Sequence, residues 1–149
     1  MSAADELIRE GYTGLFLSGD HSTARTMYER HDLQTVVRDA EDPVARVLAA
    51  EVLREFGEPP SEDLGPAYAQ ALGRLPLGNL WGMLGETSDD GPLGAHLIEQ
   101  GESAAPELRT LLDDDTPLFY DGSKEATAGN AMGYTVKDAA AYFLRRIDG

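Results

Sequence analysis

The 149-residue sequence contains no cysteine. This absence excludes a disulfide framework, thiolate zinc sites and cysteine nucleophiles. Long apolar runs are missing too: the run LFL near the N-terminus is far too short to cross a bilayer, and acidic residues stand where a signal peptide needs basic ones. We therefore expect a soluble, cytoplasmic protein that does not enter a membrane.

Positive charge is scarce as well. The sequence has 12 basic residues, of which only Lys124 and Lys137 are lysines, against 27 acidic ones, for a formal net charge of -15. Such a surface repels phosphate backbones, so we expect no nucleic-acid partner. We favour solubility in an acid-biased or salt-rich cytoplasm as the reason for the acidity. One alternative is a protein partner with a basic surface. A second is a DNA mimic, which needs rows of carboxylates, whereas the acids are spread evenly at nine per third of the chain.

Apolar residues recur at helical spacing along most of the chain, and runs of β-branched residues are absent. Length fits one domain, residues 1–149. Short helices and short turns predict an all-α fold of stacked antiparallel helix pairs, with about six to eight helices, rather than a long four-helix bundle. The expected helices run from Ser2 to Gly19, from about 20 to 28, and over 32–40, 43–56, 64–75, 92–101, 103–114 and 135–147.

Cap signals place the helix ends. Asp32, Ser103 and Thr135 are the expected N-caps of three helices, and Pro43 and Pro106 suit first turns, where a missing N–H costs nothing. Gly101 is an expected stop. The lone Trp81 is expected to fill a gap between neighbouring helices.

The segments 44–56 (VARVLAAEVLREF) and 135–147 (TVKDAAAYFLRRI) align without gaps, and each follows a helix that ends in acids and proline. This is an internal repeat of helix, acidic turn with proline, and helix. The first copy of the motif comprises Asp42, Pro43, Ala45, Arg46, Ala49, Ala50 and Leu53, and the second comprises Asp115, Pro117, Val136, Lys137, Ala140, Ala141 and Leu144. In general terms, small alanines let helices approach, and the turn acid either caps the next helix or meets its first basic residue.

At these residues the chain resembles the HEAT-repeat family, and its C-terminal half is similar to small bacterial HEAT-like proteins of unassigned function. The resemblance implies a short α-solenoid; it implies no activity. Residues 58–100 depart from the pattern because of their glycine content.

Catalytic and metal signatures are weak. His21, His31 and His96 lack the spacing of a metal site, and the acids Asp113, Asp114 and Asp115 are consecutive rather than alternating as in a calcium loop. The sequence therefore predicts no metal, no cofactor and no catalytic residue. A noncatalytic protein is the expectation.

The connection before the last helix is enlarged by residues 118–133 (LFYDGSKEATAGNAMG), where an ordinary repeat turn needs only a few residues. A long loop in a compact domain is often functional. We expect it to cap the last helix pair first and to serve as a recognition surface second. The candidate partner-binding residues are Tyr120, Asp121, Lys124, Glu125, Asn130 and Tyr134.

These observations favour a protein-binding or scaffold module of HEAT-like type. The alternatives are a small-ligand binder or enzyme with a pocket between the 118–133 segment and the helices near Trp81, and an acidic inhibitor or DNA-mimic-like binder of a basic protein.

Overall fold

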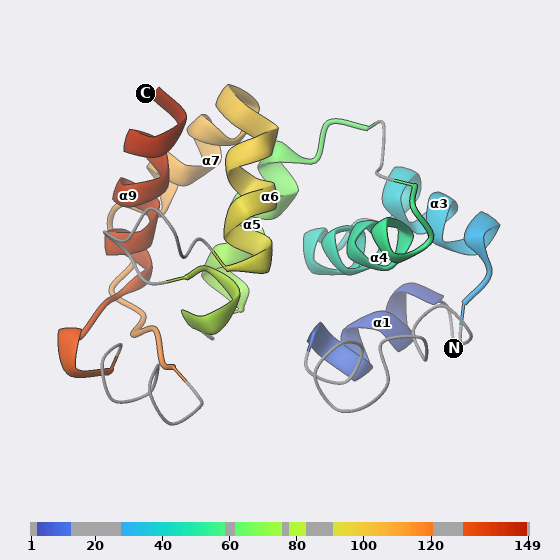
Figure 1. Cartoon of the computed structure of the whole chain (residues 1–149), viewed down its shortest axis with the longest axis horizontal. Helices are drawn as coiled ribbons and strands as arrows, with labels where there is room; N and C mark the ends of the chain where they lie inside the picture. The colour runs from blue at the N-terminus through green and yellow to red at the C-terminus, as the bar shows by residue number, and fades with distance from the viewer. Residues whose placement is uncertain are drawn as a thin grey trace. The chain divides into compact units, whose positions relative to one another are not determined.

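Seven α-helices make up most of the chain that the computed structural model describes, namely residues 3–12, 28–58, 62–75, 78–82, 91–120 and 130–148 (Figure 1). The all-α prediction is confirmed. Within these ranges no strand is longer than an isolated bridge between Pro117 and Thr135. The helices are α1 (Ala3–Tyr12), α3 (Arg30–Asp39), α4 (Pro43–Glu55), α5 (Gly65–Arg74), α6 (Pro92–Gln100), α7 (Ala105–Thr110) and α9 (Val136–Asp148), joined by short 3-10 helices η2 (Gly78–Leu80) and η3 (Gly101–Ala104).

The helices form two compact units, Met1–Glu62 and Asp63–Gly149. The expectation of a single domain over 1–149 stays a prediction, so each unit is described by itself. None of the helices in the described ranges is long and apolar enough to span a bilayer.

The first unit is organised around α4, which packs against both α3 and α1 (Figure 1). Its sequence is apolar on more than one face, so most of α4 is buried, and Val47, Leu48 and Ala49 are completely inaccessible. Leu7 of α1 and Leu33 of α3 are also fully buried. Burial on two sides makes α4 the centre of this unit's core.

The second unit packs α5, α6, α7 and α9 together, and Trp81 lies in its core. Trp81 is fully buried, its Nε1 donates to the carbonyl of Leu75 at 2.9 Å, and its ring meets that of Phe143 edge to face at 6.2 Å. Gly94 allows this close packing, because a Cβ there would lie 2.8 Å from the Trp81 carbonyl oxygen. The expectation that Trp81 fills a gap between helices is confirmed.

Two expected caps are wrong. The helix over 32–40 begins at Arg30, so Asp32 lies in its first turn rather than at its N-cap. Ser103 belongs to η3, donates to the carbonyl of Gln100 at 3.3 Å, and does not cap α7. Both residues sit close to a helix start, and local sequence does not fix a boundary to within two or three residues.

Other boundaries agree better with expectation. Pro43 and Pro106 lie in first turns, and Gly101, at φ 74°, ends α6. Helix α7 stops at Thr110, earlier than expected. In α1, Gly11 leaves helical conformation at φ 67°, eight residues before the expected stop at Gly19, which lies outside the described residues.

Candidate functional site

The connection between α7 and α9 is held together at its base by main-chain hydrogen bonds. Val136 N–H donates to the Thr116 carbonyl at 2.9 Å, and Leu118 N–H donates to the Tyr134 carbonyl at 2.9 Å. Because bonds on both sides of the Pro117–Thr135 bridge join the same two stretches, the chain leaves and returns side by side. Residues 116–118 and 134–136 therefore form a paired stem, from which the two described arms of the enlarged segment start.

Tyr120 fixes the outgoing arm to the second unit. Its side chain is only 4% exposed, and its hydroxyl donates to the Gly82 carbonyl at 2.8 Å. The ring occupies the space that a side chain at Gly78 would need, and Gly78 N–H donates to the Phe119 carbonyl at 2.6 Å. Burial of an aromatic ring with its hydroxyl satisfied makes Tyr120 an anchor of the segment.

Asn130 and Tyr134 complete this anchor. The Asn130 side-chain amide makes both of its bonds to the backbone of Tyr120: Oδ1 accepts from Tyr120 N–H at 2.9 Å, and Nδ2 donates to the Tyr120 carbonyl at 3.1 Å. The rings of Tyr120 and Tyr134 meet edge to face at 6.4 Å. Three of the six candidate residues are thus brought together, and their contacts join the two arms of the segment. The other three, Asp121, Lys124 and Glu125, lie outside the described residues.

The same segment exposes two large apolar side chains. Phe119 is 52% exposed and Met132 is 62% exposed, whereas Leu118 and Tyr120 on either side of Phe119 are buried. The alternation follows from extended backbone, in which successive side chains point to opposite faces. Sequence analysis named Tyr120 but neither Phe119 nor Met132 among the candidate partner-binding residues, and the signal that would have separated Phe119 from Tyr120 was the period of two across 118–120.

Acidic residues border the stem, and they interact with it in two ways. Asp114 Oδ1 accepts from Thr116 N–H at 2.9 Å, and hydrogen bonds from the Thr116 side chain and backbone lower the pKa of that carboxyl below its ordinary value. Lys137 Nζ pairs with Asp115 Oδ1 at 2.5 Å, and this hydrogen bond and the charge of Asp115 raise the pKa of Lys137. The expected meeting of turn acid and first-turn base is confirmed here.

The residues considered for chemistry stay dispersed in the described part of the chain. His96 lies edge to face with Tyr68 at 6.4 Å, His31 lies in the first turn of α3 in the other unit, and His21 lies outside the described residues. No group of three metal-ligating side chains occurs within the described ranges. Trp81 is fully buried with its ring against Phe143, and a pocket between the 118–133 segment and the helices near Trp81 stays a prediction.

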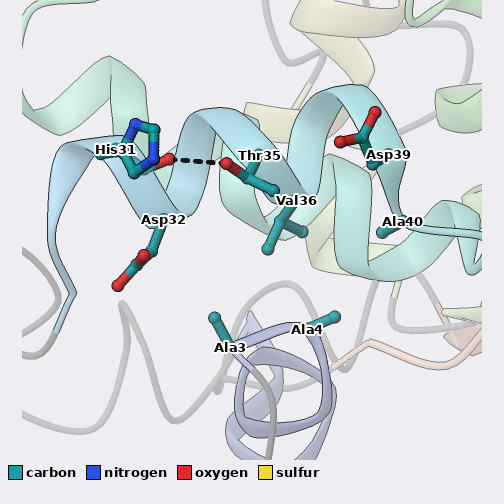
Figure 2. A pocket seen from close by; sticks show the side chains of 8 residues that line it. All are labelled: Ala3, Ala4, His31, Asp32, Thr35, Val36, Asp39 and Ala40. Atoms are coloured by element: carbon teal, nitrogen blue, oxygen red, sulfur yellow. Dashed lines mark hydrogen bonds between the residues drawn. The ribbon is translucent and has the colours of Figure 1, made fainter.

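An open cavity of about 580 Å³, exposed to solvent on one side, lies in the first unit between the start of α1 and one face of α3 (Figure 2). It is lined by Ala3, Ala4, His31, Asp32, Thr35, Val36, Asp39 and Ala40. Sequence analysis did not find it, because nothing in the two segments indicates that the start of α1 faces α3.

Comparison with known proteins adds no assignment: no family model, no curated protein and no solved structure matches this chain.

Proposed function

We propose that this chain is a noncatalytic protein-binding module of HEAT-like type, and that it contacts its partner through Phe119 and Met132. The observation that carries the proposal is their exposure on an anchored segment. Phenylalanine and methionine are enriched where protein interfaces are fully desolvated. Large apolar side chains held outward on a braced loop are therefore suited to contact another protein.

The anchor supports the proposal energetically. Phe119 lies next to Tyr120, whose backbone is bonded to the Asn130 side chain, and Met132 follows Asn130 by two residues. Because these bonds already restrict the backbone on both arms, a partner has less conformational entropy to remove on binding. The two side chains are thus presented from a preorganised support.

Charge indicates the kind of partner. Asp113 and Asp115 are exposed beside the stem, and the chain as a whole carries a formal net charge of -15. Acidic groups around an apolar contact favour a partner whose own apolar patch is bordered by basic residues. Binding should therefore weaken as salt concentration rises.

The HEAT-like part of the proposal rests on the sequence repeat and on its local geometry. In the first copy, the turn acid Asp42 accepts from Val44 N–H at 2.8 Å, and in the second, Asp115 pairs with Lys137. Each helix pair thus uses its turn acid in one of the two expected ways. Stacked helix pairs offer extended surfaces for protein binding.

The test compares affinity capture from a native lysate at low salt by three proteins: the unmodified chain, the double variant Phe119→Ser/Met132→Ser, and the control Ile8→Ser. Ile8 is an exposed apolar residue of α1, in the other unit. We expect a partner that the unmodified chain and the control retain and the double variant loses. A photoreactive amino acid at position 119 should cross-link the same partner.

Circular dichroism of the double variant should match the unmodified chain, because both replaced side chains are exposed. Equal capture by all three proteins would place the contact elsewhere. Capture of nothing at low salt would argue against a protein-binding module altogether.

A further inference from the structure

The cavity of the first unit has an apolar interior made of small side chains. Figure 2 shows the methyl groups of Ala3 and Ala4 directed from α1 toward α3, and Val36 directed from α3 toward them. Alanine on one wall leaves the space that a larger side chain would fill. The cavity is open to solvent, and its volume of about 580 Å³ accommodates a small ligand that stays partly exposed.

A carboxylate without a partner stands at one end of this interior. Asp32 precedes Val36 by four residues, so both lie on one face of α3, and Figure 2 shows its carboxylate on the same side of the helix as Val36. Among the described residues the Asp32 carboxylate has no hydrogen bond or ion pair. Its charge is therefore available to a ligand.

The second carboxylate that lines the cavity is already engaged. Asp39 Oδ1 accepts a hydrogen bond from Nε of its neighbour Arg38 at 3.2 Å, and Asp39 Oδ2 accepts one from Arg38 Nη2 at 3.2 Å. In Figure 2 its side chain is directed away from α1. Asp39 thus provides a matched comparison for Asp32, on the same helix and beside the same cavity.

The remaining polar groups favour a hydrogen-bond donor. Thr35 Oγ1 gives its hydrogen to the His31 carbonyl at 3.1 Å, which leaves lone pairs on the hydroxyl oxygen as acceptors. None of the eight lining residues is lysine or arginine. Among the described lining residues, an anionic ligand would therefore meet the carboxylate of Asp32 with no lysine or arginine to offset it.

Longer-range charge acts in the same direction. Asp5 and Glu6 lie in the first turn of α1, where their negative charges offset the partial positive charge of the helix N-terminus. The formal net charge of -15 also attracts cations. We propose that this cavity binds a primary ammonium group carried on an aliphatic stem, with the ammonium at Asp32 and the stem between Val36 and the alanines of α1. This site is separate from Phe119 and Met132, and it does not depend on the function proposed for them.

The first experiment titrates the ¹⁵N-labelled chain with three probes that share one apolar body: n-hexylammonium, n-hexanol and hexanoate. We expect n-hexylammonium to shift the amide signals of residues 31–36 and of Ala4 in a saturable way, with a dissociation constant on the order of 1 mM, as suits a ligand with few non-hydrogen atoms. Hexanol should bind more weakly and hexanoate should give no saturable shift. Equal binding of the three probes, or shifts that do not saturate, would overturn the proposal.

Variants separate the site from general attraction to an acidic surface. Asp32→Asn should weaken n-hexylammonium binding by about threefold to fivefold, which is the contribution of a partly exposed ion pair, while Asp39→Asn should change it by less than about twofold. Asp32 is exposed, so its variant should keep the fold. Ala4→Phe, which fills the cavity, should abolish the saturable shifts. Equal weakening by both aspartate variants would contradict a specific site.

The source of the ammonium group is resolved by a further probe, the blocked tripeptide acetyl-Ala-Lys-Ala-amide. Tighter binding of the tripeptide than of n-hexylammonium, with the same dependence on Asp32, would identify a lysine side chain of a polypeptide as the occupant. Tighter binding of n-hexylammonium would identify a free amine. Either result, with the Asp32 dependence, supports the proposed chemistry.

Discussion

The helix pairs α3–α4 and α7–α9 have second helices that align in sequence, but their connections are closed by different means. Three residues, 40–42, join the first pair, and its junction uses side chains: Asp42 accepts from Val44 N–H, and Arg46 Nε donates to the Val37 carbonyl at 2.8 Å. The second pair is joined by residues 111–135, and its junction uses paired main chain. A short turn has no room for main-chain pairing, so side chains must satisfy the helix ends.

The second helices of the two pairs also differ in burial. In the alignment of 44–56 with 135–147, Val47 corresponds to Asp138. Val47 is fully buried because α4 packs against two helices, whereas Asp138 is exposed and its Oδ2 accepts from Thr135 N–H at 2.9 Å at the start of α9. Similar helix sequences thus give a central helix in one unit and a one-sided amphipathic helix in the other.

Exchanging these two residues should give the largest difference in stability between the two helix pairs. Val47→Asp should reduce the free energy of unfolding by about 4 kcal/mol, because it places a carboxyl group in a fully buried apolar site. The reciprocal Asp138→Val should cost about 1 kcal/mol, the usual loss from removing a helix cap. Urea denaturation followed by circular dichroism measures both, and equal costs would show that α4 and α9 have equivalent environments.

Tyr120 tests whether the long connection of the second pair is braced. Tyr120→Ala should cost about 3 kcal/mol through loss of a buried ring. Tyr120→Phe should cost about 1 to 2 kcal/mol, because it leaves the buried Gly82 carbonyl without its donor. The fluorescence of Trp81, the only tryptophan, reports unfolding of this unit. A cost below that of the Phe119→Ser control would mean that the loop is not anchored there.

The short turn of the first pair depends on one side-chain cap. Asp42→Ala should cost about 1 kcal/mol by removing the acceptor for Val44 N–H. Glu41→Ala is the matched control, since Glu41 is an exposed acid in the same turn, and it should cost less than about 0.5 kcal/mol. Circular dichroism during urea denaturation is the measurement. Equal effects would point to general charge rather than capping.

The smallest effects concern pH at the stem of the second pair. The pKa of Asp114 lies below its ordinary value of 3.8, so its stabilisation is present above that pH and is lost as pH falls through the folded-state pKa. The pKa of Lys137 lies above 10.5, so its stabilisation is present below that pH and is lost as pH rises through the folded-state pKa.

Comparison of variants isolates these two contributions. Relative to the unmodified chain, Asp114→Asn should flatten the acid limb of a plot of urea midpoint against pH, and Lys137→Gln should flatten the alkaline limb. Trp81 fluorescence provides the midpoint. Unchanged limbs would show that these groups titrate alike in the folded and unfolded chain.

The sequence predicted the clearest helices because their signals are local. The apolar spacing and Pro43 located α4, and Thr135 with the following pattern located α9. The Asp32 and Ser103 caps failed because neither helix starts with a side-chain cap: α3 begins at Arg30 after Glu29, and α7 continues directly from η3 after Ala104. Local polar residues therefore did not locate these two helix starts.

The sequence predicted only part of the candidate site. The unusual length of 118–133 identified the segment, and three of its proposed residues, Tyr120, Asn130 and Tyr134, meet in the structure. The sequence did not predict which of the two aromatic side chains is buried, because Phe119 and Tyr120 are both large and largely apolar. Main-chain pairing of the stem fixes that choice, and it joins residues distant in sequence.

By itself, the sequence determined the helical class, the lack of thiol chemistry, the strong negative charge and the repeated helix pair, since these follow from composition and from spacing within a few turns. Only the tertiary structure decided that α4 is buried on two sides, that Tyr120 is an anchor while Phe119 and Met132 are exposed, and that α1 and α3 line an open cavity. These features depend on which faces meet. That outcome is set by the summed packing of residues far apart in the chain, which no local pattern records.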